Sequence, residues 1–351
     1  MQILKPKEVK SIEQFFQLKE ERLLKVMSKF LMMKYKEVYT TNDYLVAIGD
    51  IPVAIVAHLD TVFSTPPNDI FYDRVKNVMW SPDGLGADDR AGVYSIVQIV
   101  KQGYKPTIIF TTDEEIGGRG ANALVKEFPN APTHLKYIIE LDRQGADDCV
   151  FYDCDNSDFE EYIESFGFVT ASGTFSDISI ICPKWKIAGV NLSIGYRDEH
   201  TYSEILYIGH MLNTINKVIK MLQQASSNTV KDFEYIPIVY NSLFFKNHPE
   251  YAYLYMHGWG EENGFNTEDI VKVEQCYICG QKDLDYNLFP TKGFDNESVF
   301  ICSDCVANTE TIGWCKTCFE PFLLIDPKED KDCCQDCRER VKVNAGQRDK
   351  G

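Results

Sequence analysis

The chain of 351 residues lacks several features that mark whole classes of protein. No apolar stretch approaches the roughly 20 residues that a membrane-spanning helix needs. The amino-terminal segment carries Lys5, Lys7, Glu8 and Lys10, which interrupt any apolar core of a secretion signal. We therefore expect no membrane span and a cytoplasmic location.

Positive charge is also scarce. The sequence contains 36 Lys and Arg against 53 Asp and Glu, which gives a formal net charge of −17. A protein that binds nucleic-acid phosphates needs a basic surface. The charge balance therefore argues against a nucleic-acid partner.

Four short apolar runs lead, at or soon after their carboxyl ends, into side chains that bind metals. The runs are 53–57, 107–110, 137–139 and 189–195, and the side chains after them include His58, Asp60, Glu114, Glu115, Asp142 and His200. Runs of this length and β-branched content predict buried parallel strands, and ligands gather outside the carboxyl ends of such strands. Segments with helical spacing alternate with the runs. The pattern predicts an α/β fold with a parallel-rich mixed sheet and helices on both faces.

Other elements follow from spacing. Residues from about 8 to 35 show helical periodicity without Gly or Pro, which predicts one structural helix. Residues 44–49 and 52–59 read as strands, 91–102 as a helix, and about 203–224 as a last amphipathic helix. We place a catalytic domain at 1–224, a connector of unassigned structure at 225–270 and a cysteine-rich domain at 271–351. The connector could instead be a surface for a partner.

Five short motifs occur in an order that resembles the co-catalytic zinc peptidases, a superfamily of aminopeptidases, carboxypeptidases and N-acyl amidohydrolases. They are His58-Leu59-Asp60-Thr61-Val62, Gly86-Ala87-Asp88-Asp89-Arg90-Ala91-Gly92, Asp113-Glu114-Glu115-Ile116-Gly117, Asp142 and His200-Thr201. The resemblance covers roughly residues 50–205. As an ordered set the motifs are specific, whereas any one of them alone is weak.

The resemblance implies two catalytic zinc ions and a role for each motif. One zinc would be held by His58, Asp88 and Asp142, and the other by Asp88, Glu115 and His200. Asp60 would fix the tautomer of His58 by a hydrogen bond, and Glu114 would be the general base for a water between the metals. Glu140 lies on the same strand face as Asp142, and the family pattern favours Asp142.

Residues 143–199 leave no room for the lid domain that many carboxypeptidase-like members insert between these motifs. The chain therefore resembles the compact, lidless aminopeptidase branch. Contacts to the substrate would have to come from elsewhere, and Tyr196 and Arg197 are candidates. Asp177 is either a third substrate contact or an exposed aspartate in a turn.

These observations predict a zinc-dependent metallopeptidase that cleaves a peptide bond, and an aminopeptidase in particular. Two alternatives stay open. The same metal chemistry would serve an N-acyl amidohydrolase acting on a small molecule, and a binding protein without catalysis could be recruited through the carboxyl-terminal region. The presence of Glu114, Glu115 and the other expected ligands argues against the last alternative.

Cysteines divide the chain. Cys149, Cys154 and Cys182 read as buried thiols, whereas four CxxC pairs and Cys333 crowd the carboxyl-terminal region; the pairs are Cys276/Cys279, Cys302/Cys305, Cys315/Cys318 and Cys334/Cys337. Without a secretion signal, such pairs predict zinc sites before disulfides. We expect about two structural zinc ions in ribbon-like sites, with sequential pairing simpler than a cross-braced arrangement. A closed thiolate site has no chemistry of its own, so this region is expected to contact a protein partner.

Overall fold

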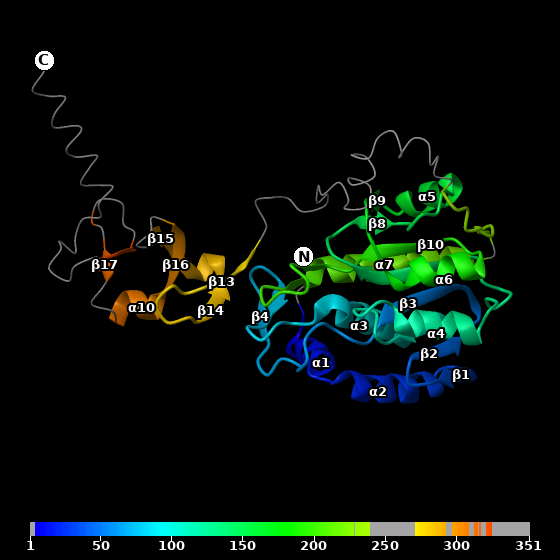
Figure 1. The fold of residues 1–351 in the computed structure, drawn as a ribbon, viewed down its shortest axis with the longest axis horizontal. Coiled ribbons are helices and arrows are strands. Elements are labelled where there is room, and N and C mark those ends of the chain that lie inside the picture. The colour runs from blue at the N-terminus through cyan, green and yellow to red at the C-terminus, as the bar shows by residue number, and fades with distance from the viewer. Residues whose placement is uncertain are drawn as a thin grey trace, which may run out of the picture. The chain divides into compact units, whose positions relative to one another are not determined.

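A computed structural model describes residues 4–227, 229–238, 271–292, 297–308, 312–314, 316 and 321–324. Contacts divide the chain into two compact units, Met1–Asp269 and Ile270–Gly351 (Figure 1). The domain limits expected from the sequence stay predictions. Among the described residues, no helix is both long enough and apolar enough to cross a membrane.

The first unit is built on an eight-stranded sheet whose central strands are parallel. In spatial order the strands are β1 (Glu37–Thr40), β2 (Tyr44–Ile48), β6 (Pro106–Thr111), β3 (Ile51–His58), β7 (Tyr137–Arg143), β10 (Gly189–Ser193), β8 (Asp148–Val150) and β9 (Val169–Thr170). β3 pairs in parallel with β6 and β7, and β10 pairs in parallel with β7. The four apolar runs thus form the four central strands, and the predicted parallel-rich mixed sheet is confirmed.

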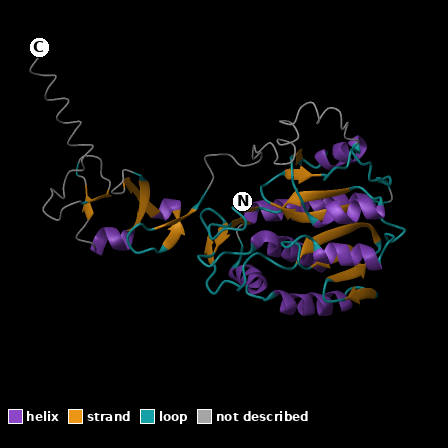
Figure 2. Ribbon diagram, viewed as in Figure 1, coloured by secondary structure: helices purple, strands orange, loops and turns teal. Residues whose placement is uncertain are grey.

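Alternate residues of the central strands enter two separate cores. In β3, Val53, Ile55 and Ala57 face one core, and Ala54 and Val56 face the other, as the two-residue period of a strand requires. The first core includes residues of α3 (Ala87–Lys101), α5 (Ser157–Glu164) and α7 (Ile208–Ser226), and the second those of α4 (Arg119–Glu127) and α6 (Asp177–Trp185). The helices flank the strands in Figure 2. The prediction of helices on both faces is confirmed.

The amino-terminal segment differs from its prediction. Two helices, α1 (Pro6–Phe16) and α2 (Glu20–Met32), replace the single expected helix over 8–35. Arg90 supplies the physical reason, because its Nη1 donates hydrogen bonds to the carbonyl oxygens of Leu18 at 2.8 Å and Phe15 at 3.4 Å. These carbonyls lie at the end of α1, where the last carbonyl groups of a helix have no N–H of the same helix to accept. Periodicity within the segment cannot reveal a partner that lies elsewhere in the chain.

A second sheet of four short strands joins two distant parts of the first unit. Its order is β11 (Tyr196–Arg197), β12 (Ile205–Tyr207), β5 (Val78–Trp80) and β4 (Phe71–Asp73). The predicted start of the last helix near residue 203 was wrong, because 205–207 pair with β5 and α7 begins at Ile208. The sheet therefore ties the loop after His58 to the segment that follows His200.

Residues 229–238 continue to pack on the first unit. The Phe233 N–H donates to the Lys136 carbonyl at 2.9 Å, and the Ala188 N–H donates to the Phe233 carbonyl at 2.9 Å. These bonds tie part of the expected connector to the residues directly before strands β7 and β10, at the amino-terminal ends of these strands. The rest of that connector, 239–270, lies outside the described residues.

The described part of the second unit consists of short hairpins around a small core. Its elements are β13 (Val273–Gln275), β14 (Lys282–Leu284), the 3₁₀ turn η2 (Asp285–Asn287), β15 (Leu288–Lys292), β16 (Ser298–Cys302), α10 (Ser303–Asn308), β17 (Ile312–Trp314) and β18 (Pro321–Leu323). Strands pair antiparallel as β13 with β14, β15 with β16, and β17 with β18. Cys276, Cys302 and Cys305 form part of the core itself, together with Leu288 and Ile301. Such a core is small, which fits a unit that needs a metal to hold it together.

Candidate metal centre

The expected ligands meet at one edge of the large sheet. His58 ends β3, Asp142 lies near the end of β7, and Glu115 follows β6 by four residues. Because these neighbouring strands are parallel, their carboxyl ends share an edge. Asp88 comes from the first turn of α3, and His200 from the loop between β11 and β12.

The side chains form two groups that share one residue. His58, Asp88 and Asp142 form one group, and Asp88, Glu115 and His200 form the other; within each, one ligand atom per residue lies within 4.8 Å of the others. Asp88 Oδ1 is 3.0 Å from His58 Nε2, and Asp88 Oδ2 is 3.2 Å from His200 Nε2. The two oxygens of one carboxylate thus face two different imidazoles, as a bridge between two metal ions requires.

The remaining contacts complete each group. Asp142 Oδ1 is 3.4 Å from His58 Nε2, and Glu115 Oε2 is 2.9 Å from His200 Nε2. The other oxygen of Glu115, Oε1, is buried without a hydrogen-bond partner among the described residues. Imidazole nitrogens and carboxylate oxygens are the donors of catalytic zinc sites. The residues present therefore fit two zinc ions.

The pKa values reflect the crowding of acids at this edge. Burial raises the pKa of the Asp142 carboxyl well above its ordinary value, and the Asp88 carboxylate raises it further. Hydrogen bonds to Asp88 and Glu115 raise the pKa of His200 to about 11. Several acids packed together repel one another when charged, and bound cations relieve that repulsion.

Asp60 orients both the first imidazole and the loop that carries the neighbouring acids. Its Oδ1 is 3.3 Å from His58 Nδ1, and its carboxylate accepts the backbone N–H groups of Glu114 at 3.2 Å and Glu115 at 3.1 Å. Burial raises the pKa of Asp60, but these contacts outweigh burial and hold it below its ordinary value. With Nδ1 held by Asp60, Nε2 of His58 is directed at Asp88 and Asp142.

Glu114 lies half-buried beside this centre. Burial raises its pKa to about 7, and the carboxylates of Asp177 and Asp88 contribute although His58 acts in the opposite direction. A carboxyl whose pKa is close to neutral can both accept and return a proton. This is the property expected of a general base.

Tyr196, Arg197 and Asp177 were the candidate substrate contacts. The Tyr196 hydroxyl donates to Asp142 Oδ1 at 3.0 Å, so this side chain reaches the centre, and Arg197 is next to it, largely buried in β11. Asp177 is fully buried at the start of α6, where its carboxylate accepts a hydrogen bond from the Thr111 hydroxyl. The alternative of an exposed aspartate in a turn was wrong, and burial leaves Asp177 no surface to offer a substrate.

Glu140, the competitor of Asp142, points elsewhere. It is fully buried, accepts a hydrogen bond from the Ser176 hydroxyl and belongs to neither ligand group. Asp142 is instead fixed by Asn191 of the adjacent strand, whose amide accepts the Asp142 N–H at 2.9 Å and donates to the Asp142 carbonyl at 2.7 Å. Sequence reasoning missed Asn191, since its role depends on the pairing of β7 with β10.

Glu204 is a second residue that sequence reasoning missed. It is fully buried, and its two carboxylate oxygens accept the backbone N–H groups of Gly86 at 2.6 Å and Asp88 at 2.9 Å. Gly86 has a φ of +68°, a left-handed conformation that glycine adopts without strain. Glu204 thus holds the turn that delivers the shared ligand. An acid four residues after His200 and directly before the apolar run 205–207 was the available signal.

Replacing Glu204 with Gln should weaken zinc retention while the fold persists. The new amide would turn an NH2 group toward backbone N–H donors, and one lost hydrogen bond at a buried polar group costs about 1–3 kcal/mol. We expect roughly 10-fold faster loss of zinc to a chelator, with an unchanged circular dichroism spectrum. Glu161→Gln, on the exposed surface of α5, is the matched control. Equal zinc retention in both variants would contradict the positioning role.

A further group of four thiols lies in the second unit. One Sγ from each of Cys276, Cys279, Cys302 and Cys305 lies within 4.8 Å of the others, and the Cys279 and Cys302 sulfurs are 3.7 Å apart. All seven described cysteines are free thiols. Burial raises the pKa of Cys276, but backbone N–H groups outweigh it and lower the pKa to about 6. Burial and neighbouring thiols raise the pKa values of Cys302 and Cys305, so the four thiols would not all be charged without a cation among them. The structure therefore brings together the first two CxxC pairs in sequence; Cys315, Cys318, Cys334 and Cys337 lie outside the described residues.

Comparison with known proteins identifies the fold. No protein-family model matches the sequence, and neither does any curated protein. The fold is similar to that of an aminopeptidase PepT from Bacillus cereus ATCC 10987, at 16% identity and a TM-score of 0.50, over 64% of this chain and 99% of the other. A tripeptidase from Staphylococcus aureus subsp. aureus Mu50 is similar at 13% identity and a TM-score of 0.52, over 64% of this chain and 99% of the other. The chain has the fold of these peptidases.

Proposed function

We propose that the first unit is a two-zinc metallopeptidase, and specifically an aminopeptidase that acts on short peptides. The observation that carries the proposal is the position of the Asp88 carboxylate: its two oxygens face His58 and His200, and the half-buried Glu114 lies beside them. The described activities of the two similar structures, an aminopeptidase and a tripeptidase, support peptides as the substrate class.

In this proposal His58, Asp88 and Asp142 hold one zinc, and Asp88, Glu115 and His200 hold the other. Bound zinc supplies a Lewis acid that polarises the scissile carbonyl and lowers the pKa of water from about 15.7 toward 7. Glu114 takes the proton of the attacking water on its carboxylate and returns it to the leaving nitrogen. Asp60 keeps Glu114 in place through the backbone of its loop.

Tyr196 and Arg197 are proposed to orient the peptide. The Tyr196 hydroxyl donates a hydrogen bond to Asp142, one of the proposed ligands, and so lies at the centre. The strands and helices of residues 143–199, an interval that the structure describes completely, belong to the two sheets and their helix layers, so this interval holds no separate lid domain.

Aminopeptidase and acylase activity can be separated by blocking the substrate. A tripeptide with a free amino terminus should be cleaved, and its N-acetylated form should be cleaved far more slowly, because an aminopeptidase requires the free amine. Amidation of the carboxyl terminus should have little effect. The measurement is product release from the three substrates by liquid chromatography. Faster cleavage of the N-acetylated substrate would favour the alternative, an N-acyl amidohydrolase acting on a small molecule.

We further propose that Cys276, Cys279, Cys302 and Cys305 hold one structural zinc, and that the other two CxxC pairs hold a second. Structural zinc binding contributes about 10–16 kcal/mol, enough to fold a unit with a small core. We propose that this unit binds a protein partner and that the protein is located in the cytoplasm.

Thiol modification distinguishes the two kinds of zinc site. A mercurial reagent should release about two zinc ions per chain, because it competes for thiolates, and should spare most of the peptidase activity, because the catalytic donors are imidazoles and carboxylates. Released zinc is measured with a colorimetric chelator. Disulfides between these cysteines in protein purified under reducing conditions would contradict the metal assignment.

A further inference from the structure

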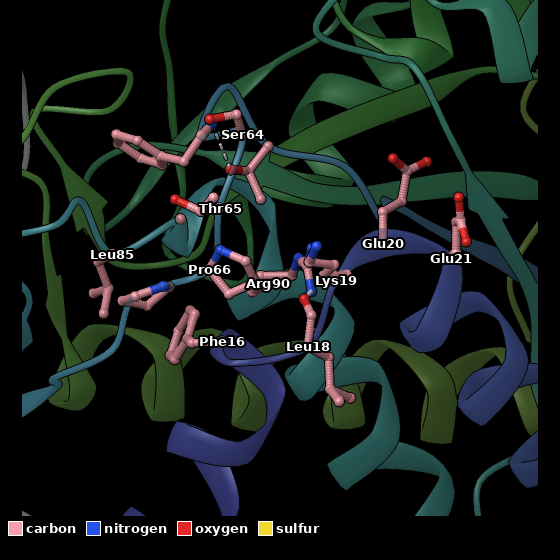
Figure 3. Close-up of a pocket in the computed structure, with 14 residues that line it drawn as sticks. Phe16, Leu18, Lys19, Glu20, Glu21, Ser64, Thr65, Pro66, Leu85 and Arg90 are labelled. Atoms are coloured by element: carbon pink, nitrogen blue, oxygen red, sulfur yellow. Dashed lines mark hydrogen bonds between the residues drawn. The ribbon is translucent and has the colours of Figure 1, made fainter.

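A cavity of about 420 Å³ lies beside the segments that carry Asp60 and Asp88, because Thr61 and Gly86 are part of its lining. Three segments line it: the α1–α2 junction from Phe16 to Glu21, the loop 61–67 that follows Asp60, and the turn around Gly86 with Arg90 (Figure 3). Its volume falls within the roughly 300–1,000 Å³ of ligand sites. The proposed reaction assigns no role to this space.

Part of the cavity wall is apolar. Phe16, Phe63, Pro66 and Leu85 line it, and Phe16 and Leu85 belong to the hydrophobic core of the unit. Figure 3 shows Leu85 and Phe16 on the left, Glu20 and Glu21 on the right, and Pro66 between them beside Arg90. A ligand that fills the space therefore meets an apolar wall at one end and charged groups at the other.

Arg90 places a buried cation in the lining. Its side chain is 4% exposed, and Nη1 donates to the carbonyls of Leu18 and Phe15, whereas Nε has no hydrogen-bond partner among the described residues. A buried donor without a partner costs free energy that an incoming acceptor recovers. Burial lowers the pKa of Arg90 to about 10, so the guanidinium is charged at neutral pH. A carboxylate is the ligand group that matches it.

Carboxylates lie across the cavity from the apolar wall. Glu20 and Glu21 occupy the first turn of α2 and line the cavity together with Arg90 and Lys19. Two cations and two anions give this lining no net charge, and Figure 3 shows the Glu20 and Glu21 carboxylates apart from the Arg90 guanidinium. A neutral lining with separated charges is complementary to a dipolar ligand.

We propose that this cavity binds a free α-amino acid with an apolar side chain. The carboxylate of the ligand lies on Arg90, its ammonium group on Glu20, and its side chain against Phe63 and Pro66, the partly exposed apolar residues of the lining. This proposal rests on the proposed function in one respect, the source of the ligand, because an aminopeptidase would release such amino acids next to this cavity. A bound amino acid would lie next to Thr61, the residue after Asp60, and to Gly86 in the turn before Asp88.

The test is calorimetric titration of the zinc-loaded full chain with L-leucine, N-acetyl-L-leucine and L-leucinamide. Leucine should bind, and the two blocked analogues should bind at least about 10-fold more weakly, because each lacks one charge. Glu20→Gln and Arg90→Lys should each weaken leucine binding by about 10-fold or more. Glu37→Gln, an exposed carboxylate on β1, should leave it unchanged.

Two further measurements keep the outcome unambiguous. Leucine bound at the metal centre instead of the cavity would lose affinity in His200→Ala, whereas cavity binding should persist there. Arg90→Lys could disturb the α1–α2 junction, which would lower its thermal stability. In that case the result for Glu20→Gln decides, because Glu20 is not one of the buried residues of the core. No leucine binding, binding insensitive to Glu20→Gln, or binding lost in His200→Ala would each overturn the proposal. Absence of peptidase activity with intact leucine binding would overturn the proposed function alone.

Discussion

Glu114→Gln should lower kcat by roughly 10²–10⁴-fold, at the upper end of that range because one group both accepts and returns the proton. The amide is close in size to the carboxyl but cannot accept a proton. KM should change little, because Glu114 makes no proposed contact with the ground-state peptide. Steady-state kinetics on any cleaved peptide measures both quantities.

Asp113→Asn is the matched control for this variant. Asp113 is the preceding residue of the same loop, its side chain is partly exposed, and its positive φ of 56° suits asparagine. We expect Asp113→Asn to keep near wild-type turnover and both variants to keep the zinc content of the parent. A wild-type rate in Glu114→Gln would show that another group moves the proton.

Asp88→Asn should have a still larger effect, because both ligand groups share this residue. The neutral amide offers one oxygen where two are needed and removes the negative charge between two cations. We expect loss of catalytic zinc from both positions and a fall in kcat on the order of 10³-fold or more. Zinc is counted by mass spectrometry of the metal content.

Asp89→Asn is the control for that loss. Asparagine is close in size to aspartate, and its amide oxygen can still accept the Gly92 N–H that Asp89 Oδ1 accepts at 2.9 Å. Zinc content near that of the parent is expected. Full zinc occupancy in Asp88→Asn would contradict the bridging role.

The sheet was predictable because its central strands are buried on both faces. Runs such as 53–57 and 108–110 are apolar at every position, which is the pattern of a strand covered by helices on both sides. The break between α1 and α2 was not predictable, because Arg90 lies more than 70 residues from the carbonyls that it holds. Strand β12 was missed for a similar reason, since its partner β5 lies far away in the sequence.

The proximity of the expected ligands followed from the same argument. His58 and Asp142 lie at or near the ends of parallel strands that pair with one another, so predicting the strands placed the side chains together. Their supporting residues were harder to predict. Asn191 and Glu204 accept hydrogen bonds from backbone N–H groups, which almost every residue type carries, and the only signal for Glu204 was its place four residues after His200 and directly before the apolar run 205–207.

Anomalous X-ray diffraction at the zinc absorption edge tests the central claim most directly. Crystals of the full chain grown with zinc should give two peaks in the first unit, one among His58, Asp88 and Asp142 and one among Asp88, Glu115 and His200. Glu114 should lie beside both without binding either. Absence of anomalous signal near Asp88 in zinc-containing crystals would contradict the two-zinc centre and the peptidase mechanism built on it.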